Sequence, residues 1–192
     1  NGNYNVIEID PEYGTEEDLH SFIREAHKRN LKVMLDLVYM HAGPSFGVKY
    51  PQYVKQNEDG TPKLNSYNFC TIDFDKPELR DHLWKNMLYF VEKFGIDAYR
   101  CDVGGAVPLD FWEEGVRRIK AIRPDFIMLN EYELHYRPED QVYAFDINYS
   151  QAFLQHAMQL IFAYEAPVSD LENVWKKEHS KCEGGMVLRG IE

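Results

Sequence analysis

The sequence predicts an α/β fold that contains a parallel sheet, and two observations support this prediction. Segments with helical and strand-like patterns alternate along most of the 192 residues, which is typical of repeated βα units. Residues 31–38 form a nearly continuous apolar run, as expected for a parallel strand covered on both faces. Such a pattern fits either a doubly wound sheet or a barrel.

The first half of the chain contains the clearest boundaries. Thr15 and Asp18 have the spacing of a capping box, and a helix is expected to follow them and to precede the strand at 31–38. Asp75 and Glu78 have the same spacing and predict a second helix, which should end at Gly95. A strand at 96–101 is expected next.

The second half continues the alternation. A helix over 108–123 should end before Pro124 and lead into a strand at 126–129. The spacing of Ser169 and Glu172 predicts the cap of a later helix that runs through Trp175. The remaining expected elements are a strand within 142–149, a helix over 150–163 and a last strand at 186–189.

Residues 42–73 interrupt this alternation of helices and strands. They contain turn signals such as Gly43-Pro44 and Asp59-Gly60 and show no helical or strand period. About thirty residues without periodicity inside a compact domain are usually a functional excursion rather than a plain connection.

Composition excludes several classes of function. A formal charge of −11 argues against nucleic acid or an anionic membrane as the partner, because both require a basic surface. No apolar run approaches the ~20 residues of a membrane span. The three cysteines lack metal-ligand spacing and predict no disulfide framework.

Polar residues cluster where the predicted strands end. Asp36 lies near the end of one strand and His41 just beyond it. Arg100 and Asp102 end the next strand, and Glu131 follows the third. Each residue alone has an ordinary structural interpretation as an ion pair or a loop contact. Together they would lie at the carboxyl edge of one sheet, where parallel α/β folds place ligands and catalytic groups.

The chemistry of this group indicates two carboxylates with different tasks. Arg100 and Asp102 stand at i and i+2, so in a strand they share a face, and the guanidinium favours the ionised acid that a nucleophile needs. Glu131 has no obvious cation nearby in the sequence, and an apolar pocket would keep it protonated as an acid. Retaining glycoside hydrolysis uses such a pair, about 5–5.5 Å apart. Cys101 has the opposite strand parity and should face the helices.

Five segments resemble motifs of a known family. They are Asp10-Pro-Glu-Tyr-Gly-Thr15, Asp36-Leu-Val-Tyr-Met-His41, Gly95-Ile-Asp-Ala-Tyr-Arg-Cys-Asp102, Met128-Leu-Asn-Glu131 and Phe145-Asp-Ile-Asn-Tyr149. In order and spacing they resemble the α-amylase family, glycoside hydrolase family 13. This resemblance implies a partial TIM (β/α)8 barrel that runs roughly from the second strand into the seventh.

The resemblance also implies a division of the chain into three parts. Residues 1–41 would be barrel, with the end of strand 2, helix 2 and strand 3. Residues 42–73 would be a short domain B, inserted after the third strand. Residues 74–192 would be barrel again, from helix 3 through the start of strand 7.

The implied activity is retaining hydrolysis of α-glucosidic linkages in starch-like or malto-oligosaccharide substrates, through a covalent glycosyl-enzyme intermediate. Asp102 would be the nucleophile and Glu131 the general acid/base, and Arg100 would orient Asp102 and keep it ionised. The substrate-binding residues would be His41, Arg100 and Tyr149, and Asp36 would support the neighbouring loop. The alternatives are a transglycosidase of the same family, a non-catalytic member that binds carbohydrate or protein, and an unrelated α/β-barrel enzyme.

The sequence departs from the family pattern in several places. Met40 stands where an asparagine often ligates calcium, and a thioether is a poor ligand for Ca²⁺, so we expect no cofactor and an absent or altered calcium site. Gly105 and Ala106 replace residues that often shape acceptor subsites. The family's third acid would lie beyond Glu192. We therefore expect a fragment with little activity of its own, whose open barrel edges favour self-association.

Overall fold

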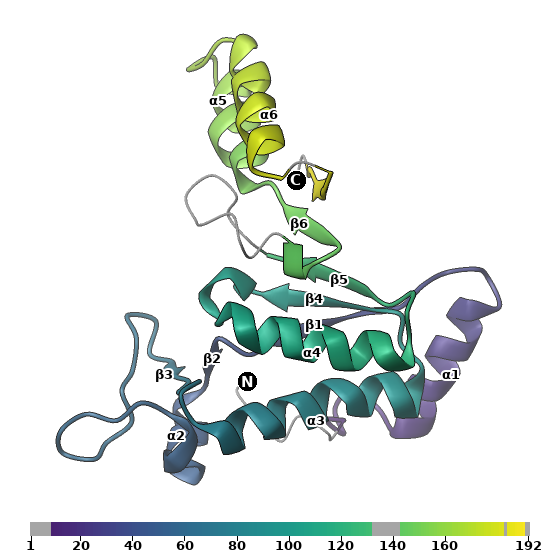
Figure 1. Ribbon diagram of the computed structural model, residues 1–192, viewed down its shortest axis with the longest axis vertical. Coiled ribbons are helices and arrows are strands. Elements are labelled where there is room, and N and C mark those ends of the chain that lie inside the picture. The colour runs from purple at the N-terminus through teal and green to yellow at the C-terminus, as the bar shows by residue number, and fades with distance from the viewer. Residues whose placement is uncertain (1–8, 132–142, 183, 191–192) are drawn as a thin grey trace.

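The computed structural model describes residues 9–131, 143–182 and 184–190 (Figure 1). Five parallel strands form its sheet, in the order β1-β4-β5-β6-β7. Their bounds are Met34–Val38, Ala98–Asp102, Ile127–Asn130, Ile147–Tyr149 and Met186–Leu188. The predicted α/β class with a parallel sheet is confirmed. The expected end of an earlier barrel strand, before Asp10, lies outside the described residues.

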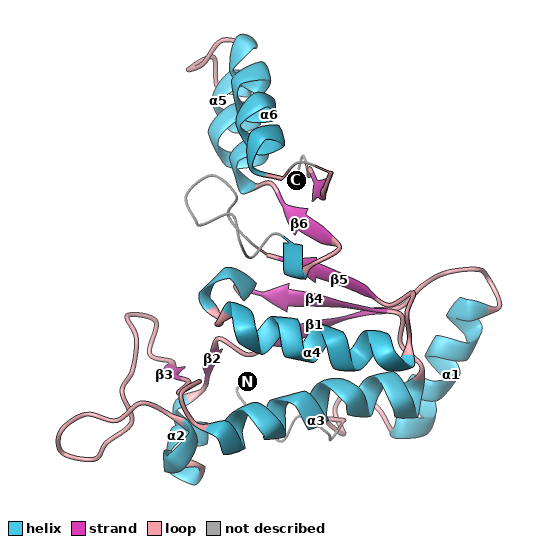
Figure 2. Cartoon of the chain, in the orientation of Figure 1, coloured by secondary structure: helices cyan, strands magenta, loops and turns pink. Residues whose placement is uncertain are grey.

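Helices follow the strands and cover the sheet (Figure 2). Helix α1 spans Glu16–His27, α3 spans Pro77–Phe94 and α4 spans Leu109–Ile122. Helices α3 and α4 lie side by side along the sheet (Figure 1). Their inward side chains form the core with those of the strands, and fully buried examples are Leu83, Met87, Tyr99, Phe111 and Trp112.

Local signals predicted some helix ends correctly and others wrongly. The capping box of α1 is present, since Thr15 Oγ1 accepts from the amide of Asp18 and Asp18 Oδ2 from the amide of Thr15. Gly95 ends α3 in the left-handed region, at φ 68°, where glycine has no Cβ penalty. The expected cap by Asp75 is wrong: Lys76 is the N-cap, without a side-chain hydrogen bond, because Pro77 already occupies the first turn.

The last third of the chain differs most from expectation. Residues Ala152–Met158 form a π-helix that continues into α5, Gln159–Phe162. Helix α6 spans Ser169–Lys181, so it runs past Trp175, and its N-cap is Val168 rather than Ser169. Buried Glu178 of α6 binds Arg189 at 2.8 Å, which fastens this helical hairpin to the residues that follow β7.

The excursion between β1 and α3 forms a small antiparallel unit. It contains β2 (His41–Ala42), α2 (Pro44–Lys49), the 3₁₀ turn η1 (Pro51–Tyr53) and β3 (Cys70–Thr71), and β2 pairs with β3. Gly47 allows α2 to approach β3, because a Cβ there would lie 2.6 Å from Cys70 Sγ. That residues 42–73 form a separate domain remains a prediction.

Buried Asp97 joins several elements at the amino end of the sheet. Its Oδ2 accepts from the Val33 amide at 2.8 Å and lies 2.7 Å from His27 Nε2. Its Oδ1 accepts from Arg123 at 3.3 Å. One carboxylate thus connects the end of α1 and the segment after α4 to the approach into β4, and it leaves the opposite edge of the sheet for the polar residues predicted from the sequence.

Candidate active site

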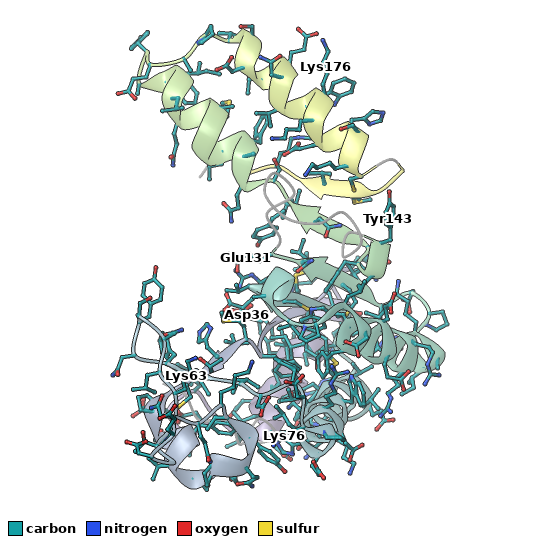
Figure 3. All side chains as sticks on the ribbon, turned by 60° about the vertical axis from the view of Figure 1, so that its left-hand side comes forward. Asp36, Lys63, Lys76, Glu131, Tyr143 and Lys176 are labelled. Carbon is teal, nitrogen blue, oxygen red and sulfur yellow. The ribbon has the colours of Figure 1, made fainter. Side chains whose placement is uncertain are left out.

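Arg100 binds three carboxylates at the carboxyl end of the sheet. Its Nη1 donates to Asp36 Oδ1 at 2.8 Å and to Asp102 Oδ1 at 2.6 Å. Its Nη2 lies 2.8 Å from Glu131 Oε2. Figure 3 shows Asp36 and Glu131 on the same side of the molecule. Four of the six predicted site residues therefore meet in one cluster.

Strand register explains this convergence. Strand β4 lies between β1 and β5, and Arg100 pairs with Asp36 on one side and with Leu129 on the other. Asp102 and Glu131 stand two residues further along their own strands or strand ends, so their side chains emerge on the same face as that of Arg100. The amide of Glu131 donates to Cys101 O at 3.1 Å, which continues the ladder past the end of β5.

The expectation that Glu131 lacks a cation is wrong, because Arg100 Nη2 contacts it directly. The two residues are far apart in sequence but occupy adjacent strands, and the long arginine side chain spans the separation. The planar guanidinium can hold several carboxylates because its N–H groups form a rigid fork.

The charge of Arg100 is firmly retained. Burial alone would lower the pKa of the guanidinium, but hydrogen bonds to Asp36 and Asp102, together with the charge of Glu131, raise it above its ordinary value. The cation therefore offsets the mutual repulsion of the carboxylates that it contacts.

The backbone after Asp102 supplies a second contact to Glu131. The amide of Val103 donates to Glu131 Oε2 at 2.8 Å. Val103 adopts φ 45° in the left-handed region, which is unusual for a β-branched residue. The sequence does not reveal this contact, since it is made by a main-chain group; the following Gly104-Gly105 pair is the nearest signal that a tight turn lies here.

The two other predicted substrate-binding residues differ in position. The Tyr149 ring, at the end of β6, lies 5.8 Å from Arg100 Cζ, so it borders the cluster. His41 begins β2, with its ring 4.7 Å from that of Phe69 and its Nδ1 3.4 Å from Met40 Sδ. His41 thus stands where the excursion leaves the sheet. The described partner of Asp36 is Arg100, and its support of the loop remains a prediction.

An absent or altered calcium site near Met40 stays a prediction. The Met40 thioether offers no oxygen ligand, and no group of three or more His, Cys, Asp or Glu suited to a metal occurs in the described part of the chain. The expectation that no cofactor is needed stays a prediction. No helix among the described residues is long and apolar enough to cross a membrane.

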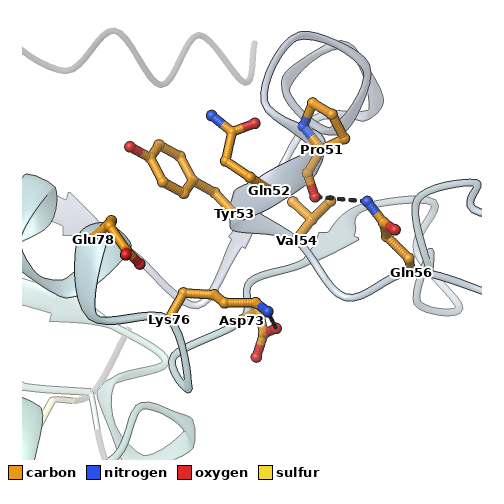
Figure 4. Close-up of a pocket in the computed structure, with 8 residues that line it drawn as sticks. All are labelled: Pro51, Gln52, Tyr53, Val54, Gln56, Asp73, Lys76 and Glu78. Atoms are coloured by element: carbon orange, nitrogen blue, oxygen red, sulfur yellow. Dashed lines mark hydrogen bonds and ion pairs between the residues drawn. The ribbon is translucent and has the colours of Figure 1, made fainter.

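A separate cleft of about 590 Å³ lies between the excursion and the start of α3 (Figure 4). Its lining includes Pro51, Tyr53, Gln56 and Lys76, and Lys76 Nζ is 3.9 Å from Asp73. None of the residues in the Arg100 cluster lines it. This cleft is therefore distinct from the candidate active site.

Comparison with known proteins supports the resemblance to one family. The model of the α-amylase catalytic domain matches residues 3–60. A maltogenic α-amylase of Bacillus acidopullulyticus is 33% identical in an alignment 145 residues long, and the match covers 65% of this chain and 25% of that protein. A cyclomaltodextrinase of Geobacillus thermopakistaniensis is 28% identical with the same coverage. The chain spans about a quarter of the length of these curated relatives.

Solved structures show the same relation. A maltogenic α-amylase of Thermotoga neapolitana superposes with a TM-score of 0.86 and 27% identity, over 97% of this chain and 44% of that one. An α-amylase of Lactobacillus plantarum gives a TM-score of 0.85 and 25% identity, over 96% and 47%. The predicted partial barrel is confirmed, and the comparisons support the α-amylase family, glycoside hydrolase family 13, as the family that this chain resembles.

Proposed function

We propose that the protein is a retaining glycosidase that acts on α-glucosidic linkages. The observation that carries this proposal is the single guanidinium that holds Asp102 and Glu131, which come from adjacent parallel strands. Two carboxylates at one sheet edge are the requirement of the retaining mechanism. The relatives' names, maltogenic α-amylase and cyclomaltodextrinase, support an α-glucan as the substrate.

In the proposed reaction, Asp102 attacks the anomeric carbon while Glu131 transfers a proton to the departing glycosidic oxygen. The bond to the leaving sugar breaks, and an ester bond forms between Asp102 and the glycosyl unit. Water then attacks the same carbon, and Glu131 accepts its proton. The ester breaks, and both carboxyl groups return to their starting states.

The neighbouring residues would support these steps. Arg100 holds Asp102 in position for attack through the 2.6 Å contact. Tyr149 and His41 would contact the sugar, since Tyr149 borders the cluster and His41 begins the adjoining excursion. Glu131 supplies a proton in the first step and regains one from the attacking water in the second.

Starch-like polymers or malto-oligosaccharides are the proposed substrates. One solved neighbour, an α-amylase of Geobacillus thermoleovorans, was crystallised with acarbose and superposes with a TM-score of 0.74 at 25% identity. Hydrolysis is preferred over sugar transfer because the relatives carry the names of hydrolases. The isolated 192 residues are expected to show little or no turnover.

The test is reducing-sugar release from starch and malto-oligosaccharides by the longest natural polypeptide that contains these residues. Asp102→Asn and Glu131→Gln should each lower kcat by several orders of magnitude, as loss of a catalytic group does. Asp110→Asn and Glu114→Gln are matched controls: these acids lie on α4 and pair with Arg80 and Arg117 rather than with Arg100, so both variants should leave kcat unchanged. If that polypeptide binds glucans without cleaving them, it is instead a non-catalytic member of the family.

A further inference from the structure

We propose that Asn130 is a positioning residue for Glu131, acting through Gly104 and the turn that follows Asp102. The inference rests on the proposed function, because it assigns Asn130 a role in placing the general acid/base. The residues form a closed circuit of contacts: Asn130 contacts Gly104, Gly104 follows Val103, the Val103 amide binds Glu131, and Glu131 follows Asn130 in the chain. Three features of the structure support the proposal in successive steps.

The first step is the burial of Asn130. This residue ends β5 and is 0% exposed. It pairs with Cys101 of β4 and with Asn148 of β6, so its side chain lies on the helix-facing side of the sheet, opposite to that of Glu131. Neither Nδ2 nor Oδ1 of Asn130 hydrogen-bonds to any residue that the structure describes. Packing alone does not favour such a side chain, since burying an unpaired amide is costly.

The second step is the contact between Asn130 and Gly104. A Cβ at Gly104 would collide with Asn130 Oδ1, and it would lie 3.3 Å from Cys101 Cβ. Glycine is therefore the residue that fits above the Asn130 amide. From the other side, the indole Nε1 of Trp112 donates to Gly104 O at 2.9 Å. The turn at Gly104 is thus held between Asn130 of β5 and Trp112 of α4.

The third step is the strained residue between Gly104 and the nucleophile. Val103 holds φ 45°, a conformation that persists only when its surroundings enforce it and that concentrates at functional sites. In this conformation its amide points to Glu131 Oε2. A shift of Gly104 would change the backbone angles of Val103 and so turn the Asp102–Val103 peptide, which carries this donor. Asn130 therefore positions Glu131 from the helix-facing side of the sheet, through the Val103 amide, and does not contact the substrate.

The experiment compares two substrates that differ in their need for an acid. Maltotetraose releases a sugar whose oxygen must be protonated, whereas 2-chloro-4-nitrophenyl maltotrioside releases a phenolate that departs with little protonation. In the longest natural polypeptide, Asn130→Ala should lower kcat/KM for maltotetraose by about tenfold or more relative to the aryl substrate, a fraction of the 10²–10⁴ that a positioned general acid supplies. Asn148→Ala removes a buried amide from the neighbouring strand and should leave that ratio unchanged.

A second pair of variants tests the contact itself. Gly104→Ala alone should reduce kcat/KM for maltotetraose, and adding Asn130→Ala should recover part of the loss, because the collision with Oδ1 disappears. If Asn130→Ala does not accumulate in folded form, Asn130→Ser replaces it in the same comparison. Equal losses on the two substrates, or strictly additive losses in the double variant, would overturn the proposal.

The same assay separates this inference from the proposed function. If Glu131→Gln abolishes turnover of maltotetraose while Asn130→Ala leaves the substrate ratio at its starting value, only the role of Asn130 fails. If Glu131→Gln retains full activity on maltotetraose, the proposed function fails, and with it the premise of the inference.

Discussion

Arg100 is the residue on which the candidate site depends. A single side chain, with both terminal nitrogens engaged, holds acids from three consecutive strands of the sheet. A lysine would carry the same charge, but as a point charge without the planar fork that binds two acids in fixed directions. Replacing Arg100 with lysine can therefore separate the effect of the charge from the effect of the guanidinium geometry.

Arg100→Lys is expected to lower kcat/KM on malto-oligosaccharides by about 10²-fold, the scale of a misplaced catalytic group. The reason is that an ammonium cannot reach Asp102 and Glu131 in the geometry that Nη1 and Nη2 provide. Arg117→Lys is the matched control, because the exposed Arg117 pairs with Glu114 on α4 and not with the acids of the Arg100 cluster. Steady-state kinetics check the prediction, and a loss below twofold in Arg100→Lys would contradict it.

Site residues could be predicted where the sequence pattern that marks them spans only a few neighbouring positions. The i, i+2 spacing of Arg100 and Asp102 predicted their shared face, and the structure pairs them. The contact between Arg100 and Glu131 depends on which strands are neighbours, and no local pattern reports that. The Val103 amide and the buried Asn130 were missed for a related reason, since a main-chain donor and an ordinary asparagine carry no residue-type signal.

At the scale of elements, Asp97 holds the amino end of the sheet in register. It accepts hydrogen bonds from Val33 and Arg123 and contacts His27. Because Val33 precedes β1 and Asp97 itself precedes β4, the carboxylate aligns the two strands whose other ends carry Asp36 and Asp102.

Asp97→Asn should lower the free energy of unfolding by about 3 kcal/mol, since removing one partner of a buried charged network leaves the others uncompensated. Asp125→Asn is a matched control: Asp125 is exposed and bonds the same Arg123 at 3.4 Å, so its loss should cost about 0.5 kcal/mol or less. Urea unfolding of both variants measures the difference. Equal midpoints for the two variants would show that the network contributes nothing.

The same carboxylate predicts a pH dependence. Burial disfavours the charged form of Asp97, but the Val33 amide, His27 and Arg123 outweigh it and lower the pKa below the ordinary 3.8. A lowered pKa in the folded state means that the stabilisation is complete above the unfolded value and is lost as the pH falls through the folded one. Stability should therefore drop below about pH 4, and less steeply in Asp97→Asn. Urea midpoints between pH 2 and 7 test this, and parallel curves would refute it.

Element boundaries show which sequence signals are dependable. Thr15 and Gly95 were read correctly, because a cap and a left-handed stop are satisfied within a few residues. Asp75 failed since Pro77 starts the helix regardless of the preceding acid. Strand β1 begins at Met34 rather than at residue 31 because its ladder with β4 starts at Met34 and Ala98, a pairing that the apolar run itself does not encode.

For the whole molecule, alternation of helices and strands predicted a parallel sheet but left its curvature open. The choice of a barrel came from the order of five motifs, and the superposition on α-amylases confirms it. Periodicity reports which face of each element is buried, whereas closure depends on strand tilt and stagger around the whole sheet.

The sheet as described has two free edges, and this leads to a prediction about association. Strand β1 pairs only with β4, and β7 only with β6, within the described residues. Apolar side chains are open at both edges, with Met34 40%, Met186 62% and Leu188 45% exposed. An unpaired strand with exposed apolar side chains is a template for pairing with another chain.

We therefore expect the 192-residue chain, expressed alone, to form oligomers by a concentration of ~100 µM. This concentration lies within the range in which exposed strand edges drive association. Leu188→Lys should shift the distribution toward monomer, because an edge lysine opposes strand addition. Val48→Lys is the control: Val48 is 76% exposed but lies on α2, away from both edges. Sedimentation velocity measures all three species, and if association occurs yet responds equally to both substitutions, general apolar exposure rather than the β7 edge is its cause.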